Sequence, residues 1–273
     1  MSKKISRYLS PQIYKSIFSG QKDVTIHTER KKLTIFFSDI KDFTATTERL
    51  QPEQITRLLN EYFTEMSAIA LGHGGTIDKF VGDAMLIFFG DPETKGEAED
   101  AAACLRMAID MQRRIAELNA KWRNEGIEHP FRVRMGVNTG FCNVGNFGSS
   151  DRMDYTIIGA EANLAARLQS IAEPGHIVIS YETYALVRGM LVAHPLPPIT
   201  MKGISRDVVP YAIEGILDHT GAKVEIFSEH MTGLDFFLDP AVMDARTSAH
   251  VRAVLQNAIA TLDRHRAKSR DGV

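Results

Sequence analysis

Apolar runs and regularly spaced apolar positions divide the chain into short strands and amphipathic helices. Leu33 to Ser38 is a continuous run of residues with good strand propensity, which predicts a buried strand. From Pro52 to Gly72 the apolar residues recur at intervals of three and four, which predicts a helix. A hairpin follows, with Thr76 to Val81 and Ala84 to Phe89 as its strands and Gly82-Asp83 as its turn.

The later elements continue the mixture of hairpins and helices. The elements expected are a helix from Glu97 to about Lys121, a hairpin of Phe131 to Asn138 and Phe141 to Val144 around Thr139-Gly140, a strand from Met153 to Ile158, a helix from Ala160 to Ala172, and strands from Ile177 to Ser180 and from Val208 to Ile213. Because hairpins interrupt the alternation of strands and helices, the pattern is α+β rather than a doubly wound parallel sheet. The opening βαββαβ order predicts a ferredoxin-like core.

The two ends of the chain differ from this central part. Near the N-terminus, Ser10-Pro11 is a helix start for a segment that ends at Gly20. After about Asp218 we expect a loop, Phe227 to Leu238, and an amphipathic helix from Pro240 to about His265, which packs on the domain or on a second copy. The predicted divisions are an N-terminal helical segment 1–30, a central domain 31–217 and a C-terminal tail 218–273.

Composition excludes several classes of protein. The 32 Lys and Arg residues against 34 Asp and Glu residues leave a net charge of −2, so no basic excess indicates nucleic-acid binding. The two cysteines, Cys104 and Cys142, fit a reducing compartment and are interpreted as packing residues. The longest strongly apolar run, Ala84 to Phe89, is far shorter than the about 20 residues of a membrane helix, and no signal-peptide core is present. We therefore expect a soluble, cytoplasmic chain.

Two aspartates are the first candidates for chemistry. Asp39 ends the first strand, and Asp83 lies in the turn of the following hairpin. Because a strand, a crossover helix and a second strand in one sheet normally run parallel, both strand exits should lie at the same edge, where the two carboxylates should meet. Such a pair suits Mg²⁺, which takes its other ligands from water and substrate phosphates. The alternative is a turn role, for which Asp is well suited.

Six sequence motifs, in order and with fitting spacing, resemble the catalytic domain of class III nucleotidyl cyclases. The likeness covers about residues 30 to 217, and the number of motifs argues against chance resemblance. The motifs are Phe37-Ser-Asp-Ile-Lys-Asp-Phe43, Lys79-Phe-Val-Gly-Asp83, Arg134-Met-Gly-Val-Asn-Thr-Gly140, Tyr155-Thr-Ile-Ile-Gly159, Asn163-Leu-Ala-Ala-Arg167 and Met201-Lys-Gly203. No Gly-Gly-Asp/Glu-Glu-Phe signature of the related diguanylate cyclases occurs.

The resemblance implies a lyase that uses two divalent cations, Mg²⁺ or Mn²⁺. Asp39 and Asp83 would hold the ions, with the carbonyl of Ile40 as a further ligand. One ion would lower the pKa of the ribose 3′-hydroxyl, and the other would stabilise the leaving pyrophosphate, in an intramolecular in-line displacement. Asp42 does not match the metal position of the family and is expected to be a solvated or capping residue.

The same resemblance assigns residues to the sugar and the phosphates. Asn163 would orient the ribose and Arg167 would contact the α-phosphate; they are four residues apart and so share one face of a helix. Arg134 and Lys202 would hold the β- and γ-phosphates. Without the other motifs, Arg167 would be interpreted as an exposed helix residue and Lys202 as a solvated surface residue.

The purine-reading positions of the family correspond to Lys79 and Thr156. A Lys ammonium donates to N1 of adenine but cannot accept from N1–H of guanine, and a Thr hydroxyl accepts from the adenine amino group, so ATP is favoured over GTP. Guanylate cyclases typically carry an acidic residue at the Lys position, and guanylate cyclase is the alternative within this chemistry. The Thr form resembles the subgroup sensitive to bicarbonate or CO₂, which makes such an effector a hypothesis for this chain.

In the family, each site is shared between two subunits, so the resemblance implies a two-fold homodimer. One subunit would supply the metal aspartates and Arg134; the other would supply Lys79, Thr156, Asn163, Arg167 and Lys202. The segment from Tyr8 to Gly20 resembles the transducer element that couples such domains to an upstream sensor or membrane domain. The alternative to an enzyme is a catalytically silent nucleotide-binding regulatory module. The presence of all these residues disfavours it.

Overall fold

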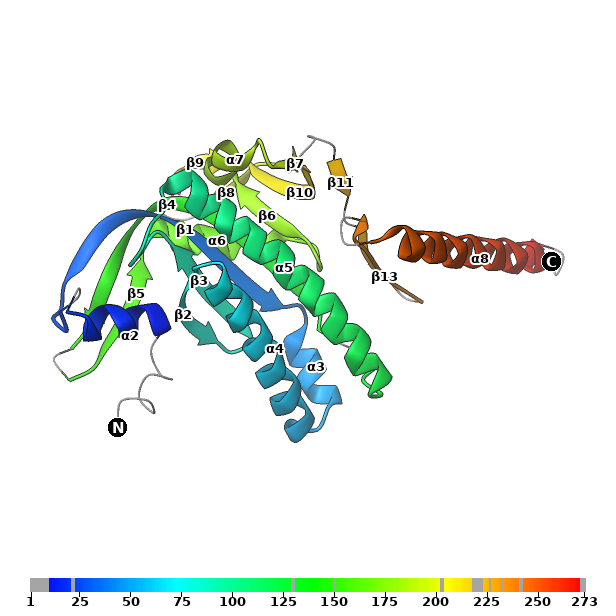
Figure 1. The fold of residues 1–273 in the computed structure, drawn as a ribbon, viewed down its shortest axis with the longest axis horizontal. Helices are drawn as coiled ribbons and strands as arrows, with labels where there is room; N and C mark the ends of the chain where they lie inside the picture. Colours follow the sequence, from blue (N-terminus) through cyan, green and yellow to red (C-terminus); the bar gives the residue numbers. More distant parts are fainter. Residues whose placement is uncertain are drawn as a thin grey trace.

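The computed structural model of the chain describes residues 10–20, 23–128, 131–149, 151–201, 204–217, 223–225, 227–231, 233–240 and 243–270. Figure 1 shows a central sheet with the long helices α4 and α5 beside it, and a C-terminal helix, α8, that extends away from the sheet. The chain therefore has a mixed fold of strands and helices, and the α+β prediction is confirmed.

Nine of the described strands form the central sheet, in the order β11-β10-β6-β4-β1-β3-β2, with β5 paired to β4 and β7 to β10. Their bounds are β1 Thr28–Ile40, β2 Thr76–Val81, β3 Ala84–Phe89, β4 Val133–Gly148, β5 Met153–Ile158, β6 Ile177–Ser180, β7 Leu191–Pro195, β10 Pro210–Leu217 and β11 Lys223–Glu225. Neighbours within β4-β1-β3-β2 are antiparallel. Together with α4 and α5 these four strands form the predicted βαββαβ unit.

The helices described are α2 Pro11–Phe18, α3 Phe43–Arg49, α4 Pro52–Gly72, α5 Glu97–Asn124, α6 Ala160–Ile171, α7 Tyr181–Val187 and α8 Ala245–Arg270. The bounds of α4 are as predicted, because Pro52 occupies its first turn and Gln51 and Gln54 form a capping box ahead of it. Among these described helices, none combines the length and the apolar character needed to cross a bilayer.

Both faces of the sheet are covered in its central part. Alternate residues of a strand point to opposite faces, and β3 follows this rule with all six residues buried. Met85 and Ile87 belong to the apolar cluster that includes residues of α4 and α5. Leu86 and Phe88 belong to a second cluster, which includes Ala165 of α6. The sheet therefore lies between the α4–α5 pair and α6.

Both cysteines belong to this packed interior, as predicted. Cys104 of α5 and Cys142 of β4 are free thiols, and both are buried. Burial raises the pKa of Cys142 to about 11, so its thiol stays protonated at neutral pH.

The predicted hairpin around Thr139-Gly140 is wrong. β4 continues unbroken through these residues and pairs with β1 along the whole length of β1, which consequently begins at Thr28 rather than Leu33. The Thr139 hydroxyl is buried 2.9 Å from that of Thr34. A Cβ at position 140 would lie 2.6 Å from Cγ of Glu161, so glycine at this position makes room for the Glu161 side chain of α6. The Thr-Gly pair thus serves the packing of α6 on the strand, and not a turn.

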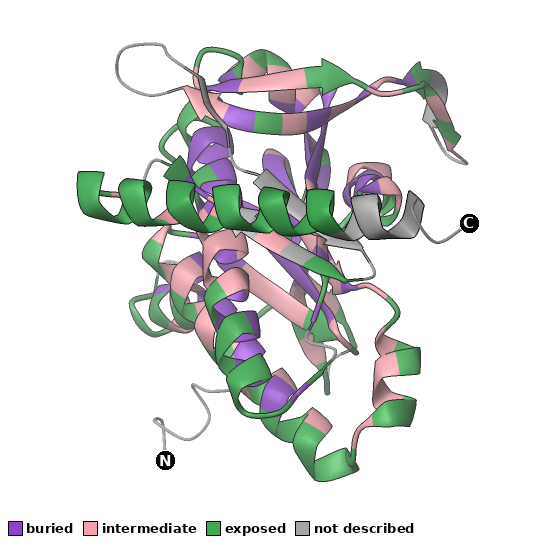
Figure 2. Ribbon diagram, turned by 90° about the vertical axis from the view of Figure 1, so that its right-hand side faces the viewer, coloured by how far each residue is buried: buried purple, intermediate pink, exposed green. Residues whose placement is uncertain are grey.

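The C-terminal tail also differs from its prediction. Instead of a loop, β12 Phe227–Met231 and β13 Leu234–Leu238 form an antiparallel hairpin, and β8 Ile199–Met201 pairs with β9 Ile204–Val208 earlier in the chain. Helix α8 begins at Ala245, not at Pro240, because the Asp244 carboxylate caps it by accepting the N–H of Thr247 at 2.7 Å. The side chains described in α8 are mostly exposed, so this helix does not cover the core (Figure 2).

Candidate active site

The two aspartates lie together at the end of β1, an inner strand of the central sheet. β1 and β2 are both antiparallel to β3 and therefore run in the same direction. Ser38 is opposite Met85 in the β1–β3 register, which brings the β2–β3 turn beside the end of β1. The backbone N–H of Ile40 donates to Oδ2 of Asp83 at 2.9 Å. Asp83 thus contacts the residue that directly follows Asp39.

Arg134 is part of the same group. It lies opposite Asp39 in the β1–β4 register, and its guanidinium donates to both carboxylate oxygens, with Nε 3.0 Å from Oδ1 and Nη2 2.7 Å from Oδ2. Burial raises the pKa of Asp83; the hydrogen bond from Ile40 opposes this shift, and the negative charge of Asp39 adds to it. The group therefore brings together two carboxylates, Asp39 and Asp83, and one positively charged side chain, Arg134.

The donor set fits a hard divalent cation that also binds phosphate. Asp39, Asp83 and the carbonyl of Ile40 would supply oxygen ligands, which Mg²⁺ and Mn²⁺ prefer. Within the described ranges, no cluster of three or more His, Cys, Asp or Glu side chains is positioned to hold a metal ion. Mg²⁺ characteristically binds through one or two carboxylates and completes its shell with water and substrate phosphates, so the residues present fit such an ion.

Lys79 and Thr156 come from β2 and β5, and a buried carboxylate connects them. Asp78 lies at a bulge of β2, between the paired residues Ile77 and Lys79. Its Oδ2 accepts from Thr156 Oγ1 at 2.6 Å and from the N–H of Ile157 at 3.2 Å. Its Oδ1 lies 3.3 Å from Lys79 Nζ, an ion pair without hydrogen-bond geometry. Burial raises the pKa of Asp78, and these partners oppose the shift.

Asn163 and Arg167 are exposed on α6, one helical turn apart. The opposite side of α6 is buried through Leu164 and Leu168. The helix packs directly on Gly136 of β4, where an added Cβ would lie 2.2 Å from the backbone nitrogen of Gln169. This close approach fixes the distance between α6 and the sheet, and thereby the position of Asn163 and Arg167.

The predicted site residues thus form two groups within one chain. In the part that the structure describes, no hydrogen bond or ion pair joins Asp39, Asp83 or Arg134 to Lys79, Thr156, Asn163 or Arg167. Lys202 lies outside the described residues. Asp42, the nearest competitor as a ligand, has an exposed side chain at the start of α3 and pairs with Lys41 at 3.4 Å.

The family model described as the adenylate and guanylate cyclase catalytic domain matches residues 26–215, which is more than half of the chain. The chain belongs to this family. Adenylate cyclase 1 of Rhizobium meliloti (strain 1021) is 32% identical over 198 residues, which is 69% of this chain and 28% of that protein. The cyclase domain seen here thus spans well under half the length of that curated relative.

Two solved structures of cyclases have similar folds. The crystal structure of the adenylyl cyclase CyaB from P. aeruginosa is 53% identical, with a TM-score of 0.67, over 69% of this chain and 96% of that chain. The crystal structure of the guanylyl cyclase Cya2 is 33% identical, with a TM-score of 0.67, over 72% of this chain and 99% of that chain. Because the similar proteins include both adenylyl and guanylyl cyclases, the similarity does not determine which purine this chain prefers.

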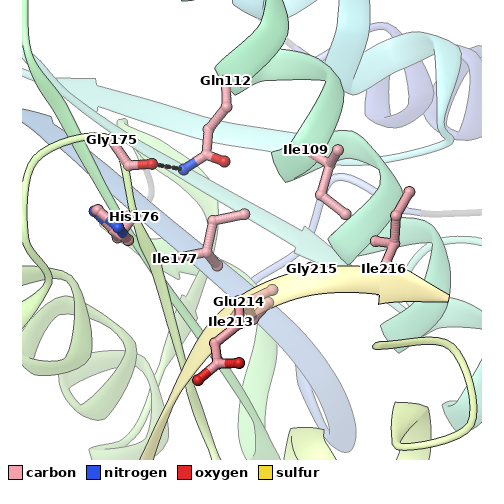
Figure 3. A pocket seen from close by; sticks show the side chains of 9 residues that line it. All are labelled: Ile109, Gln112, Gly175, His176, Ile177, Ile213, Glu214, Gly215 and Ile216. Atoms are coloured by element: carbon pink, nitrogen blue, oxygen red, sulfur yellow. Dashed lines mark hydrogen bonds between the residues drawn. The ribbon is translucent and has the colours of Figure 1, made fainter. Parts of the chain in front are cut away.

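A cavity inside the cyclase domain lies apart from the predicted site residues. It lies between α5 and strands β6 and β10, where Gln112 Nε2 donates to the carbonyl of Gly175 (Figure 3). Its volume of about 30 Å³ has room for one or two water molecules, whereas ligand pockets typically measure about 300–1,000 Å³. None of its nine lining residues is a predicted site residue. The cavity is therefore too small to hold a nucleotide.

Sequence reasoning missed Asp78. Its neighbours in the hairpin, Lys79 and Asp83, match motifs of the cyclase family, whereas Asp78 lies outside the matched motif. The sequence did contain a signal for this residue. Asp78 is the single acidic residue within the strand Thr76–Val81, and a carboxylate that is buried in a sheet needs a hydrogen-bond or ion-pair partner. The bulge that directs its side chain toward Thr156 cannot be read from apolar periodicity.

Proposed function

We propose that this chain is an adenylate cyclase, which converts ATP to 3′,5′-cyclic AMP and pyrophosphate. The observation that carries the proposal is the hydrogen bond from the Ile40 N–H to Asp83, which brings the second aspartate to the end of the strand that contains Asp39. Two carboxylates and the Ile40 carbonyl at the end of β1 suit two Mg²⁺ or Mn²⁺ ions. A turn role for the aspartates does not account for this meeting of two negative groups.

The residues around the carboxylates suit a triphosphate. When bound, the two cations activate the ribose 3′-hydroxyl as a nucleophile and neutralise the leaving pyrophosphate. Arg134 binds the β- and γ-phosphates, for which its planar fork of donors is suited. Arg167 binds the α-phosphate, where charge is redistributed during attack, and Asn163 orients the ribose. Lys202 is the further phosphate ligand that the motif match suggests.

The purine preference follows from Lys79 and Thr156. Lys79 can only donate, which matches the N1 acceptor of adenine and conflicts with the N1–H of guanine. The Thr156 oxygen can accept a hydrogen bond from the adenine amino group. Their proximity through Asp78 supports joint action on one base. A guanine-reading site would instead need an acceptor at position 79.

A homodimer completes the site in this proposal. One copy would supply Asp39, Asp83 and Arg134, and the other would supply Lys79, Thr156, Asn163, Arg167 and Lys202. The two separate groups within each chain would then meet across a two-fold axis. Exposed apolar side chains support this arrangement. Phe80, Val81 and Ile158 are 45%, 54% and 52% exposed, next in sequence to the purine-reading residues or close to them. A second copy would remove these side chains from water.

Regulation of this activity is expected to come from outside the domain. The N-terminal helix α2 contacts the cyclase domain where Gln12 Nε2 donates to the carbonyl of Gly75 at 2.7 Å. This contact supports α2 as the connection to an upstream sensor or membrane domain. The Thr form of the purine pair makes bicarbonate or CO₂ a candidate effector. If bicarbonate, added at fixed pH and metal concentration, leaves the rate of cyclic AMP formation unchanged, this effector hypothesis is refuted.

The direct test is to incubate the purified chain with ATP and Mn²⁺ or Mg²⁺ and to measure cyclic AMP, with Asp83→Ala as the inactive control. GTP is then added as a competing substrate. The proposal predicts cyclic AMP formation that Asp83→Ala abolishes and that equimolar GTP inhibits weakly. Preferential formation of cyclic GMP would instead identify a guanylate cyclase. Nucleotide binding without either product would identify a silent regulatory module.

A further inference from the structure

We propose that Asp78 is a positioning residue that sets the purine preference by holding the hydroxyl proton of Thr156. The inference rests on the proposed adenylate cyclase activity and concerns a residue outside the six motifs of the resemblance. With its proton donated to Asp78, Thr156 presents only lone pairs to the base. The site would then select a purine that donates from its 6-position, which is the case for adenine and not for guanine.

The geometry restricts both side chains. Asp78 has a side chain that is 1% exposed, and Thr156 is 6% exposed, so neither hydroxyl nor carboxylate exchanges partners freely with water. Oδ2 of Asp78 lies 2.6 Å from Thr156 Oγ1, the distance expected for a charge-assisted hydrogen bond from a hydroxyl to a carboxylate. The N–H of Ile157 donates to the same oxygen at 3.2 Å. Two donors therefore fix Oδ2 in place.

The direction of the Thr156 hydrogen bond follows from the chemistry of its partner. An ionised carboxylate only accepts, so the single O–H of Thr156 must point at Asp78. The remaining lone pairs of Oγ1 can accept the 6-amino group of adenine. The 6-oxo group of guanine is itself an acceptor. Guanine would therefore place two buried acceptors, its O6 and the Thr156 oxygen, against each other with no proton between them. Without Asp78 the hydroxyl can rotate and donate to that oxo group.

Asp78 also lies beside the other purine-reading residue. At the bulge of β2 its Oδ1 is 3.3 Å from Lys79 Nζ. The Lys79 side chain is 41% exposed, so this ion pair is weak and does not fix the ammonium group. The effect of Asp78 on purine selection therefore acts through the Thr156 hydroxyl.

A purely structural account of Asp78 is the competing explanation. In that account the carboxylate only joins β2 to β5, and its loss would weaken ATP and GTP equally. The two accounts differ in the ratio of affinities, not in stability. A double-mutant cycle with Thr156 separates them, because an effect transmitted through the Thr156 hydroxyl must vanish once that hydroxyl is gone.

The experiment uses the full chain as wild type, Asp78→Ala, Asp78→Asn, Thr156→Val and the double variant Asp78→Ala/Thr156→Val. For each, kcat/KM is measured with ATP and with GTP. Dissociation constants are measured for 3′-deoxy-ATP and 3′-deoxy-GTP, which lack the attacking hydroxyl and cannot cyclise. Circular dichroism and thermal melting establish that each variant is folded. Asp78→Ser, which is small and hydratable, replaces Asp78→Ala if the latter does not fold.

The proposal predicts that the ATP-to-GTP ratio falls about tenfold in Asp78→Ala, equivalent to about 1.4 kcal/mol. Asp78→Asn keeps the ratio near wild type, because its amide oxygen can accept from Thr156 and Ile157 in place of Oδ2. In the Thr156→Val background, loss of Asp78 leaves the ratio unchanged.

Two kinds of result overturn the proposal. The first is a folded Asp78→Ala with the wild-type ratio, or a ratio change that persists in the Thr156→Val background; either refutes the inference and leaves the cyclase activity standing. The second is a wild-type chain that neither binds nor cyclises either nucleotide, which refutes the proposed function and this inference with it.

Discussion

Arg134 and Asp39 lie opposite each other in neighbouring strands and form a two-point ion pair, with contacts of 3.0 and 2.7 Å. A third nitrogen of the same guanidinium, Nη1, donates to the carbonyl of Ser170 at 3.2 Å, near the end of α6. Arg134 therefore connects a proposed metal ligand to the helix that carries Asn163 and Arg167. Both oxygens of Asp39 are engaged, so a cation and Arg134 compete for this carboxylate.

This competition predicts opposite effects of Arg134→Ala on two measurements. Without nucleotide, the affinity for Mn²⁺ should rise several-fold, because the guanidinium no longer occupies Asp39. With ATP, kcat/KM should fall about 100-fold, since a charged contact to the phosphates is lost. Mn²⁺ binding is measured by electron paramagnetic resonance. Arg134→Lys is the matched control and should recover part of kcat/KM only, because an ammonium group cannot bind bidentately. A lower Mn²⁺ affinity in Arg134→Ala would contradict the competition.

Asp83→Asn should abolish catalysis without unfolding the domain. We expect a loss of at least about 1,000-fold in kcat, because the amide cannot replace a metal-binding carboxylate. Burial disfavours the charged form of Asp83, as its raised pKa indicates, so a neutral side chain of the same shape should keep the melting temperature near wild type. Asp42→Asn is the matched control, since Asp42 is exposed and its left-handed backbone, with φ of 55°, tolerates Asn. Equal losses in both variants would refute the metal assignment.

Gly136→Ala should destabilise the domain and reduce activity together. The new Cβ would lie 2.2 Å from the nitrogen of Gln169 and 2.3 Å from the carbonyl oxygen of Ala165, so α6 must move away from the sheet. We expect the free energy of unfolding in urea to fall by about 2–3 kcal/mol, in the range of overpacking substitutions. Gly189→Ala is the control, because nothing lies within 4 Å of its Cβ. Wild-type stability of Gly136→Ala would show that α6 is not fixed by this contact.

The ATP-to-GTP affinity ratio should fall as the pH is lowered through the pKa of Asp78. Burial raises the pKa of Asp78, so this carboxyl takes up a proton at a higher pH than an exposed Asp. The acceptor-only carboxylate exists above that pKa and is lost as the pH falls through it, which frees the Thr156 hydroxyl to donate. The readout is the binding of the two 3′-deoxy nucleotides, and Asp78→Asn, which cannot titrate, serves as control. A ratio that varies equally in both proteins would assign the effect to another group.

Much of this fold could be predicted from sequence because its signals are local. The bounds of β2, β3, β5 and β6 are as predicted, since Gly-containing turns delimit short apolar runs. The prediction failed where residues typical of a turn are required for packing against a distant part of the chain. Thr139-Gly140 has turn composition, but Gly140 makes room for Glu161, which is distant in sequence. The six motifs identified the candidate site residues, whereas Asp78 acts through a bulge and a contact between β2 and β5 that only the structure shows.

The most direct test of the central claim, a cyclase site shared between two copies, is to mix Asp39→Ala chains with Asn163→Ala chains. Each variant alone should be inactive. In a mixed dimer one site carries both substitutions and the other carries neither. Random pairing at equal concentrations should therefore restore about one quarter of the wild-type rate of cyclic AMP formation. No recovery, despite mixed dimers shown by native mass spectrometry, would contradict the shared site.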